Sequence, residues 1–278
     1  MASFELRTFR SADGYRWYYR HYAAAGRPRG RIAFLHGIRS HGGWYGRSCE
    51  AFAAAGYDVD FLDRRGSGLN TAHRGDAPNF RRLLDDVAEF LLDLRRTRPW
   101  VPLHLAGISW GGKLAVGLPY RKPGLVDSIV LLCPGLCAKV SPSFGQRVAI
   151  GRARVRNPSK LFPIPLSEPV LFTGSPEWQA FVAANPHDLR MATARFLFGS
   201  ASLDLYLKRA AKRATVPSLL LLAEHDRIID NARTKQFVEA FPTPPKVIEY
   251  PGAHHTLEFE PPGHPFVADT LAWLEKLN

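Results

Sequence analysis

Residues 107–111 read GISWG and match the pattern G-x-S-x-G, with Ser109 at the centre. An apolar run at residues 103–105 precedes this stretch, and a helical pattern at residues 113–120 follows it. A sharp turn between a strand and a helix exposes a serine hydroxyl and aims the first N–H groups of the helix at a bound anion. The flanking glycines are needed because a side chain there would clash with a neighbouring strand or helix. We therefore predict that Ser109 is a nucleophile rather than an incidental serine in a glycine-rich turn.

A serine nucleophile needs a histidine that takes its proton and an acid that orients this histidine. In this strand–turn–helix setting both are expected later in the chain, in the order Ser, Asp, His. An apolar run at residues 219–223 is followed by Asp226, and the run at residues 246–250 is followed by His254 and His255. Because the carboxyl ends of parallel strands meet at one edge of a sheet, we expect these side chains near Ser109.

Two choices arise within this set. Asp230 follows the same predicted strand as Asp226, but its position is typical of the N-terminal cap of the next helix, where aspartate is favoured. We therefore predict Asp226 as the acid. His254 and His255 are adjacent and cannot both face the serine, and spacing alone does not choose between them.

Apolar runs alternate with amphipathic helical patterns along the chain, which predicts parallel strands joined by right-handed crossovers. The runs are almost continuously apolar, as strands covered on both faces require. The predicted strands cover residues 4–9 and 15–22 (an opening hairpin), 31–36, 57–62, 103–108, 128–133, 218–223 and 246–250, and further helices cover residues 79–98, 231–241 and 265–277. We therefore predict an α/β fold with a mostly parallel, eight-stranded, doubly wound sheet.

The alternation stops after residue 134 and resumes before residue 218. Residues 135–214 are rich in proline, basic and aromatic residues, with twelve Lys or Arg against four Asp or Glu. We predict that they form a cap inserted over the strand ends, in a core made of residues 1–134 and 215–278. Aromatic residues of this region, Phe144 and Trp178 among them, either line an apolar slot over the nucleophile or only pack the cap on the core.

The stretch after the predicted strand at residues 31–36 supplies a second part of the site. Residues 36–45 read HGIRSHGGWY. In a serine hydrolase of this type, one backbone N–H from this loop and one from the residue after the nucleophile bind the oxyanion. The candidates are Ile38 and Trp110.

With these residues in place, the chain resembles the monoacylglycerol lipase and lysophospholipase group of α/β-hydrolases, which is also grouped with the serine aminopeptidases of family S33. The matching features are His36, Gly37, His41 and Tyr45 in the first loop, residues 63–68 in the pattern D-x-x-G-x-G, Asp226, and His255 after Gly-Ala-x with Leu257 and Glu258 or Glu260 beyond it. The resemblance selects His255 over His254 as the base. It is weaker for the substrate, because Trp110 replaces the common Met and adds bulk beside the acyl site.

The resemblance implies an α/β-hydrolase fold and ester hydrolysis through an acyl-enzyme, with monoacylglycerols or lysophospholipids as substrates. It implies no metal and no cofactor. His41 and His254 are expected near the substrate. A carboxylesterase for small esters is the alternative, followed by a binding protein that uses the same scaffold without catalysis. The second alternative is disfavoured because Ser109, Asp226 and His255 are all present.

The chain of 278 residues has a formal net charge of +12. The basic residues lack a recognised nucleic-acid motif, so we expect either a solvated basic face or contact with an anionic membrane surface. Three cysteines without disulfide-rich spacing favour a reducing compartment. No run reaches the ~18 apolar residues of a membrane span, and the N-terminus does not resemble a signal peptide. We expect a soluble, cytoplasmic protein, and the sequence does not define an oligomeric state.

Overall fold

The computed structural model describes residues 4–277, and an eight-stranded sheet forms its centre. The strand order is β1-β2-β4-β3-β5-β6-β9-β10. The first two strands pair antiparallel, β2 pairs antiparallel with β4, and all other pairs are parallel. The strands are β1 (Glu5–Arg10), β2 (Arg16–Tyr22), β3 (Gly30–Leu35), β4 (Tyr57–Leu62), β5 (Leu103–Ile108), β6 (Ser128–Leu132), β9 (Ser218–Ala223) and β10 (Lys246–Tyr250). The predicted fold class is confirmed.

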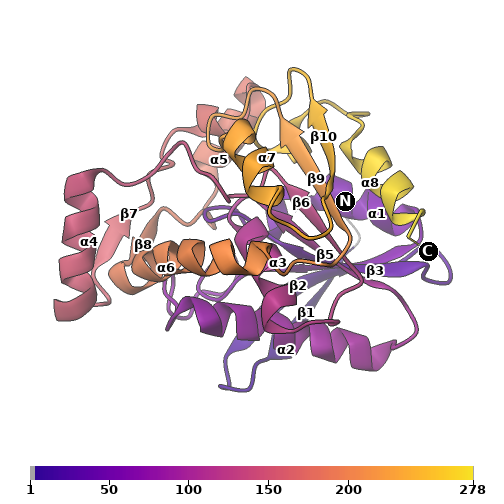
Figure 1. The fold of residues 1–278 in the computed structure, drawn as a ribbon, viewed down its shortest axis with the longest axis horizontal. Coiled ribbons are helices and arrows are strands. Elements are labelled where there is room, and N and C mark those ends of the chain that lie inside the picture. Colours follow the sequence, from indigo (N-terminus) through magenta and orange to yellow (C-terminus); the bar gives the residue numbers. More distant parts are fainter. Residues whose placement is uncertain (1–3, 278) are drawn as a thin grey trace.

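The five inner parallel strands are buried along their whole length, whereas the edge strands β1 and β10 are partly exposed. Helices on both faces explain this burial (Figure 1). α1 (Gly46–Ala54) and α8 (Phe266–Leu274) pack against each other, and α3 (Gly111–Arg121) packs against α2 (Phe80–Thr97). A mainly apolar sequence is therefore favoured in the inner strands, as predicted, although Arg31, Asp58, Asp60 and His104 are also buried there.

The helix boundaries follow local signals. The side chain of Asn79 accepts a hydrogen bond from the Arg82 N–H and begins α2, within one residue of the predicted start. α7 (Asn231–Val238) ends earlier than predicted, because residues 239–241 form tight turns before Pro242, which has no N–H to continue a helix. None of the helices in residues 4–277 has the length and apolar content that crossing a bilayer requires.

Residues 133–217 join β6 to β9 and are called here the β6–β9 segment. It contains α4 (Phe144–Arg156), β7 (Leu161–Pro163), η2 (Pro169–Leu171), α5 (Pro176–Ala184), β8 (Met191–Thr193) and α6 (Ala194–Ala211). Strands β7 and β8 form a separate antiparallel pair. In Figure 1 the segment extends to the left of the sheet, with α4 at its far end. The helix α6 runs back from there and packs on α3.

Candidate active site

Ser109 lies in the turn between β5 and α3 with a backbone φ of +50°, in the left-handed region that residues other than glycine rarely adopt. The glycines around it are required by close packing. A Cβ on Gly107 would lie 2.7 Å from the Cα of Gly112, and one on Gly111 would overlap the carbonyl oxygen of Leu35 on β3. The predicted reason for both glycines is confirmed, and the strained turn holds the serine side chain at the end of the strand.

Ser109, His255 and Asp226 form one hydrogen-bonded series. His255 Nε2 lies 3.0 Å from Ser109 Oγ, and His255 Nδ1 lies 2.7 Å from Asp226 Oδ2. The other carboxylate oxygen of Asp226 accepts the N–H groups of Ile228 and Ile229, each at 2.8 Å. All three residues are buried: Ser109 is 8% exposed, His255 3% and Asp226 2%. In this geometry the histidine can take a proton from the serine hydroxyl while the aspartate holds the imidazole in place.

The two neighbouring alternatives have other partners. Asp230 accepts the Arg233 N–H at 3.0 Å and caps α7, as the sequence predicts. His254 Nδ1 lies 3.1 Å from Glu260 Oε1, which also accepts the His254 backbone N–H at 2.6 Å. Each of these side chains is therefore held by a local structural contact.

The loop after β3 is held by a set of hydrogen bonds around the peptide group that joins Gly37 to Ile38. His36 Nδ1–H donates to the Gly37 carbonyl at 2.7 Å, and the Arg64 N–H donates to His36 Nε2 at 2.8 Å. The Gly37 N–H donates to Ser40 Oγ at 3.0 Å. Burial, together with the charge of Arg64, lowers the pKa of His36 to about 3, so the imidazole stays neutral and keeps this tautomer.

A cavity of about 510 Å³ extends from Ser109 into the β6–β9 segment. Ile38 and Trp110, the two candidate oxyanion residues, line it next to the serine. The rest of the wall is mainly apolar and comes from α4, α6, the turn after β9 and the stretches that follow β6 and β7, with Ile150, Leu197, Phe198 and Ile229 among its residues. Such a cavity suits an apolar acyl group placed next to a nucleophile.

The cavity wall also contains charged side chains. Lys113 on α3 and Asp204 on α6 line it and form an ion pair with 2.5 Å between Nζ and Oδ1. The sequence predicts that Lys113 lies on the helix after Ser109, but it does not predict the pairing of Lys113 with Asp204.

The four other residues expected at the substrate do not line this cavity. Phe144 is 83% exposed on the outer side of α4, and Trp178 stacks on Phe259 with ring centroids 4.6 Å apart. His41 Nε2 lies 3.0 Å from Asn185 Oδ1, and His254 binds Glu260 as described above. Trp178 thus packs the segment on the core, and the aromatic part of the cavity wall comes from Trp110 and Phe198 instead.

One further group lies against the acid. Cys133, directly after β6, has a backbone φ of +42°, and burial beside Asp226 raises the pKa of its thiol. Ligand atoms of Cys133, Asp226 and His255 lie within 4.8 Å of one another, close enough in principle for a metal ion. Both nitrogens of His255 are already bound, one to Asp226 and one to Ser109, so an ion would have to displace these contacts.

The sheet topology and the turn at Ser109 define an α/β-hydrolase fold. Residues 26–262 match the family described as serine aminopeptidase, S33 (Hydrolase_4). Because the match spans most of the chain, the protein belongs to this family, and the predicted family resemblance is confirmed.

Individual relatives agree with this assignment. The chain is 29% identical to a monoacylglycerol lipase of Mycolicibacterium smegmatis over 89% of this chain and 88% of that lipase. It is 27% identical to lysophospholipase L2 of Escherichia coli over 74% of this chain and 68% of that enzyme. A solved structure of a soluble variant of monoglyceride lipase from Saccharomyces cerevisiae, with a substrate analogue, superposes with a TM-score of 0.87 at 17% identity, covering 100% of this chain and 97% of that one. At that identity the superposition shows the fold alone.

Proposed function

We propose that the protein is a serine hydrolase that cleaves the carboxylic ester of a monoacylglycerol-type or lysophospholipid-type lipid. The hydrogen-bonded series of Ser109, His255 and Asp226 at one end of a mainly apolar cavity carries this proposal. The names of the two relatives support the same class of substrate. No metal or cofactor is needed for this chemistry, because the serine supplies the nucleophile.

The reaction follows from the positions of the three side chains. Ser109 Oγ attacks the ester carbonyl carbon while His255 Nε2 accepts the hydroxyl proton. Asp226 holds His255 in the tautomer with the proton on Nδ1 and stabilises the imidazolium that forms. The backbone N–H groups of Ile38 and Trp110 stabilise the oxyanion.

Collapse of the tetrahedral intermediate breaks the ester bond to the alcohol, which leaves with the proton from His255. The acyl group then stays on Ser109. Water attacks this acyl-enzyme with His255 again acting as the base, and the fatty acid is released.

The charges around the cavity favour an ester over a peptide with a free N-terminus. An aminopeptidase needs an anionic group that binds the substrate ammonium. Of the described residues that line the cavity, Asp204 is the one carboxylate, and Lys113 is paired with it. Asp188, elsewhere in the β6–β9 segment, is buried in an ion pair with Arg39.

Substrate class is tested by a chain-length series of p-nitrophenyl esters, followed by monoacylglycerols and lysophospholipids of the same acyl length. We expect kcat/KM to rise beyond four acyl carbons, because each added methylene is worth up to about 0.8 kcal/mol when it is buried. A maximum at two to four carbons would replace the lipid proposal with the alternative, a carboxylesterase for small esters.

We further propose that residues 135–214 act as a cap that meets an anionic lipid surface through α4. Phe144 and Val155 are 83% and 84% exposed, and with Val148 they follow one side of this helix. The helix also carries four basic residues, Arg147, Arg152, Arg154 and Arg156. Exposed apolar side chains beside arginines fit the interface of an anionic bilayer.

Co-sedimentation with vesicles tests this contact. We expect binding to phosphatidylserine-containing vesicles that is weaker with phosphatidylcholine alone, and a loss of binding in the double variant Phe144→Ser, Val155→Ser. Trp100→Ser is the matched control, because Trp100 is 74% exposed and lies in the loop before β5, outside the β6–β9 segment. Equal binding by the double variant and the wild type would place the contact elsewhere.

We also propose that the protein is located in the cytoplasm. All three cysteines are free thiols, as proteins of reducing compartments have them. Cell fractionation tests it: recovery with the secreted proteins would contradict the proposal.

A further inference from the structure

Arg64, in the loop after β4, is a buried cation that has no ion-pair partner in the described part of the chain. Arg64 is only 5% exposed, and no carboxylate among residues 4–277 forms an ion pair with it. Its Nε and Nη1 atoms are buried without a hydrogen-bond partner in the described part of the chain. The neighbouring carboxylate of Asp63 is engaged by Arg20 at 3.2 Å and by the Gly42 N–H at 2.7 Å. A buried charge of this kind opposes folding, so its presence calls for a function.

The guanidinium contacts both candidate oxyanion residues. Arg64 Nη2 donates a hydrogen bond to the Ile38 carbonyl at 2.9 Å. Its Cζ lies 4.9 Å from the ring centroid of Trp110 and 4.9 Å from that of Phe196, and these two rings also contact each other, with centroids 5.4 Å apart. One positive charge therefore lies between the loop that carries the Ile38 N–H and the residue that carries the second N–H.

The backbone of Arg64 supports the same loop separately from the side chain. Its N–H binds His36 Nε2, and His36 in turn binds the Gly37 carbonyl, which belongs to the same peptide group as the Ile38 N–H. A substitution of the Arg64 side chain leaves this backbone connection in place. It therefore tests the charge and its contact with Ile38 alone.

We propose that Arg64 is a positioning residue that orders the loop after β3, which carries the Ile38 N–H, against Trp110. Its positive charge also stabilises the oxyanion that forms during ester hydrolysis. The inference rests on the proposed function. A fixed positive charge inside a site of low dielectric stabilises the negative charge of the transition state. The free-energy cost of burying that charge is met during folding and not during the reaction. Burial lowers the pKa of Arg64 to about 9, so the guanidinium is still charged at neutral pH.

A structural role for Arg64 predicts a different result. If the guanidinium served only to hold the Trp110 and Phe196 rings together, its removal would lower the melting temperature. If it serves the transition state, Arg64→Met removes a buried unpaired charge, keeps an apolar stem against the two rings, and leaves the melting temperature equal or higher. The reaction would then be slower in a protein that is no less stable.

Kinetics of Arg64→Met and Arg64→Lys make the test. For Arg64→Met we expect kcat on a p-nitrophenyl ester to fall about tenfold, less than the ~10²–10³ lost with a direct oxyanion donor, with KM little changed. Affinity for an alkylboronic acid should fall by the same factor, because Ser109 Oγ adds to the boron and leaves a tetrahedral anion in the oxyanion site. Arg64→Lys keeps the charge and should recover most of the rate.

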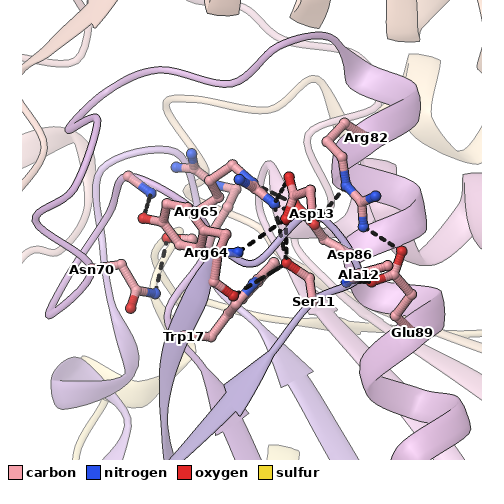
Figure 2. Close-up of polar contacts among 12 residues, drawn as sticks. Ser11, Ala12, Asp13, Trp17, Arg64, Arg65, Asn70, Arg82, Asp86 and Glu89 are labelled. Carbon is pink, nitrogen blue, oxygen red and sulfur yellow. Dashed lines mark hydrogen bonds and ion pairs between the residues drawn. The ribbon is translucent and has the colours of Figure 1, made fainter.

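Arg65→Met is the matched control, because Arg65 is the adjacent buried arginine. Figure 2 shows its contacts with Asp13 and Asp86, beside Arg82, which also binds Asp86. The two hydrogen bonds from Arg65 to Asp86 are 2.7 and 2.8 Å long. We expect Arg65→Met to lower the melting temperature and to leave kcat unchanged in the folded enzyme.

Several results would overturn the inference. They are an unchanged kcat in Arg64→Met, an equal loss of kcat in Arg65→Met, an Arg64→Lys variant as slow as Arg64→Met, or an Arg64→Met chain that does not fold. If the wild type is active and any of these variant results is found, this inference is wrong but the proposed function stands. A folded wild type without esterase activity overturns the proposed function and this inference together.

Discussion

Arg39 and Asp188 form a buried ion pair that joins the loop after β3 to the β6–β9 segment. Arg39 follows Ile38 in the chain, its Nε lies 2.9 Å from Asp188 Oδ1, and its Nη2 binds Asp188 Oδ2. The Arg39 carbonyl also accepts the Leu189 N–H at 3.0 Å. Because both partners are buried, this contact joins the loop at Ile38 and the β6–β9 segment into one structural unit.

Breaking this pair should cost much of the stability of the protein. In Asp188→Asn the Arg39 charge stays buried without its counter-charge, which costs about 3–5 kcal/mol of the free energy of unfolding. Arg190→Ala is the control, because Arg190 lies 3.5 Å from the same carboxylate but its side chain is 59% exposed. Its loss should cost about 0–1 kcal/mol. Urea unfolding measures both, and similar losses in the two variants would contradict this account of the pair.

The two adjacent histidines should behave very differently. His255→Ala removes the imidazole that contacts Ser109 and that we propose as the base, so it should lower kcat by about 10⁴-fold or more. His254→Ala removes a contact with Glu260 and should keep most of the activity. Esterase kinetics on the two purified variants decide the question. A large loss in His254→Ala with an active His255→Ala would move the base by one residue.

The two aspartates after β9 offer a similar pair. Asp226→Asn keeps the shape of the side chain but favours the wrong tautomer of His255, so kcat should fall by about 10⁴-fold. Asp230→Ala removes the cap of α7 and should cost about 1 kcal/mol of stability with kcat unchanged. Thermal unfolding and kinetics together separate the two effects. If Asp230→Ala proved the slower enzyme, the assignment of the acid would be wrong.

Stability should depend on pH through Glu258, three residues after His255. Burial raises the pKa of this carboxyl from 4.5 to about 7, and its Oε2 has no hydrogen-bond partner in the described residues. The folded state therefore binds the proton more tightly than the unfolded state. The free energy of unfolding falls as pH rises from about 4.5 to about 7, by about 3 kcal/mol in total.

Glu258→Gln removes this titration and keeps an oxygen that can accept the Ser48 N–H. The difference in unfolding free energy between the variant and the wild type should be small near pH 4.5 and should reach its full size above pH 7, with the variant more stable there. Urea unfolding at pH 4.5, 6 and 8 gives this difference. A difference that stays constant across the three pH values would show that Glu258 does not titrate in this window.

Local sequence signals were enough to predict the central sheet and the order of the site residues. The glycines around Ser109 indicate a tightly packed turn, and Asp226 and His255 each follow an apolar strand. In a parallel sheet these positions meet at one edge, so the spacing along the chain carries three-dimensional information. The choice of His255 over His254 came from the family resemblance and not from the spacing.

Contacts between distant segments could not be predicted in the same way. Arg39 and Asp188 lie 149 residues apart, and nothing in the sequence near either residue identifies the other. The contact of Arg64 with the rings of Trp110 and Phe196 likewise depends on how the β6–β9 segment packs. Phe144 was expected either to line the substrate slot or to pack the cap on the core, but the side of a helix that faces solvent depends on tertiary packing, and Phe144 is on that side.

The central claim, an activated serine at position 109, is tested most directly with a fluorophosphonate probe and mass spectrometry of the labelled peptide. We expect the wild type to be labelled on Ser109, Ser109→Ala to be unlabelled, and His255→Ala to react far more slowly than His254→Ala. Circular dichroism shows that each variant is folded. A folded wild type that does not react, or a Ser109→Ala variant that reacts equally well, would contradict the claim.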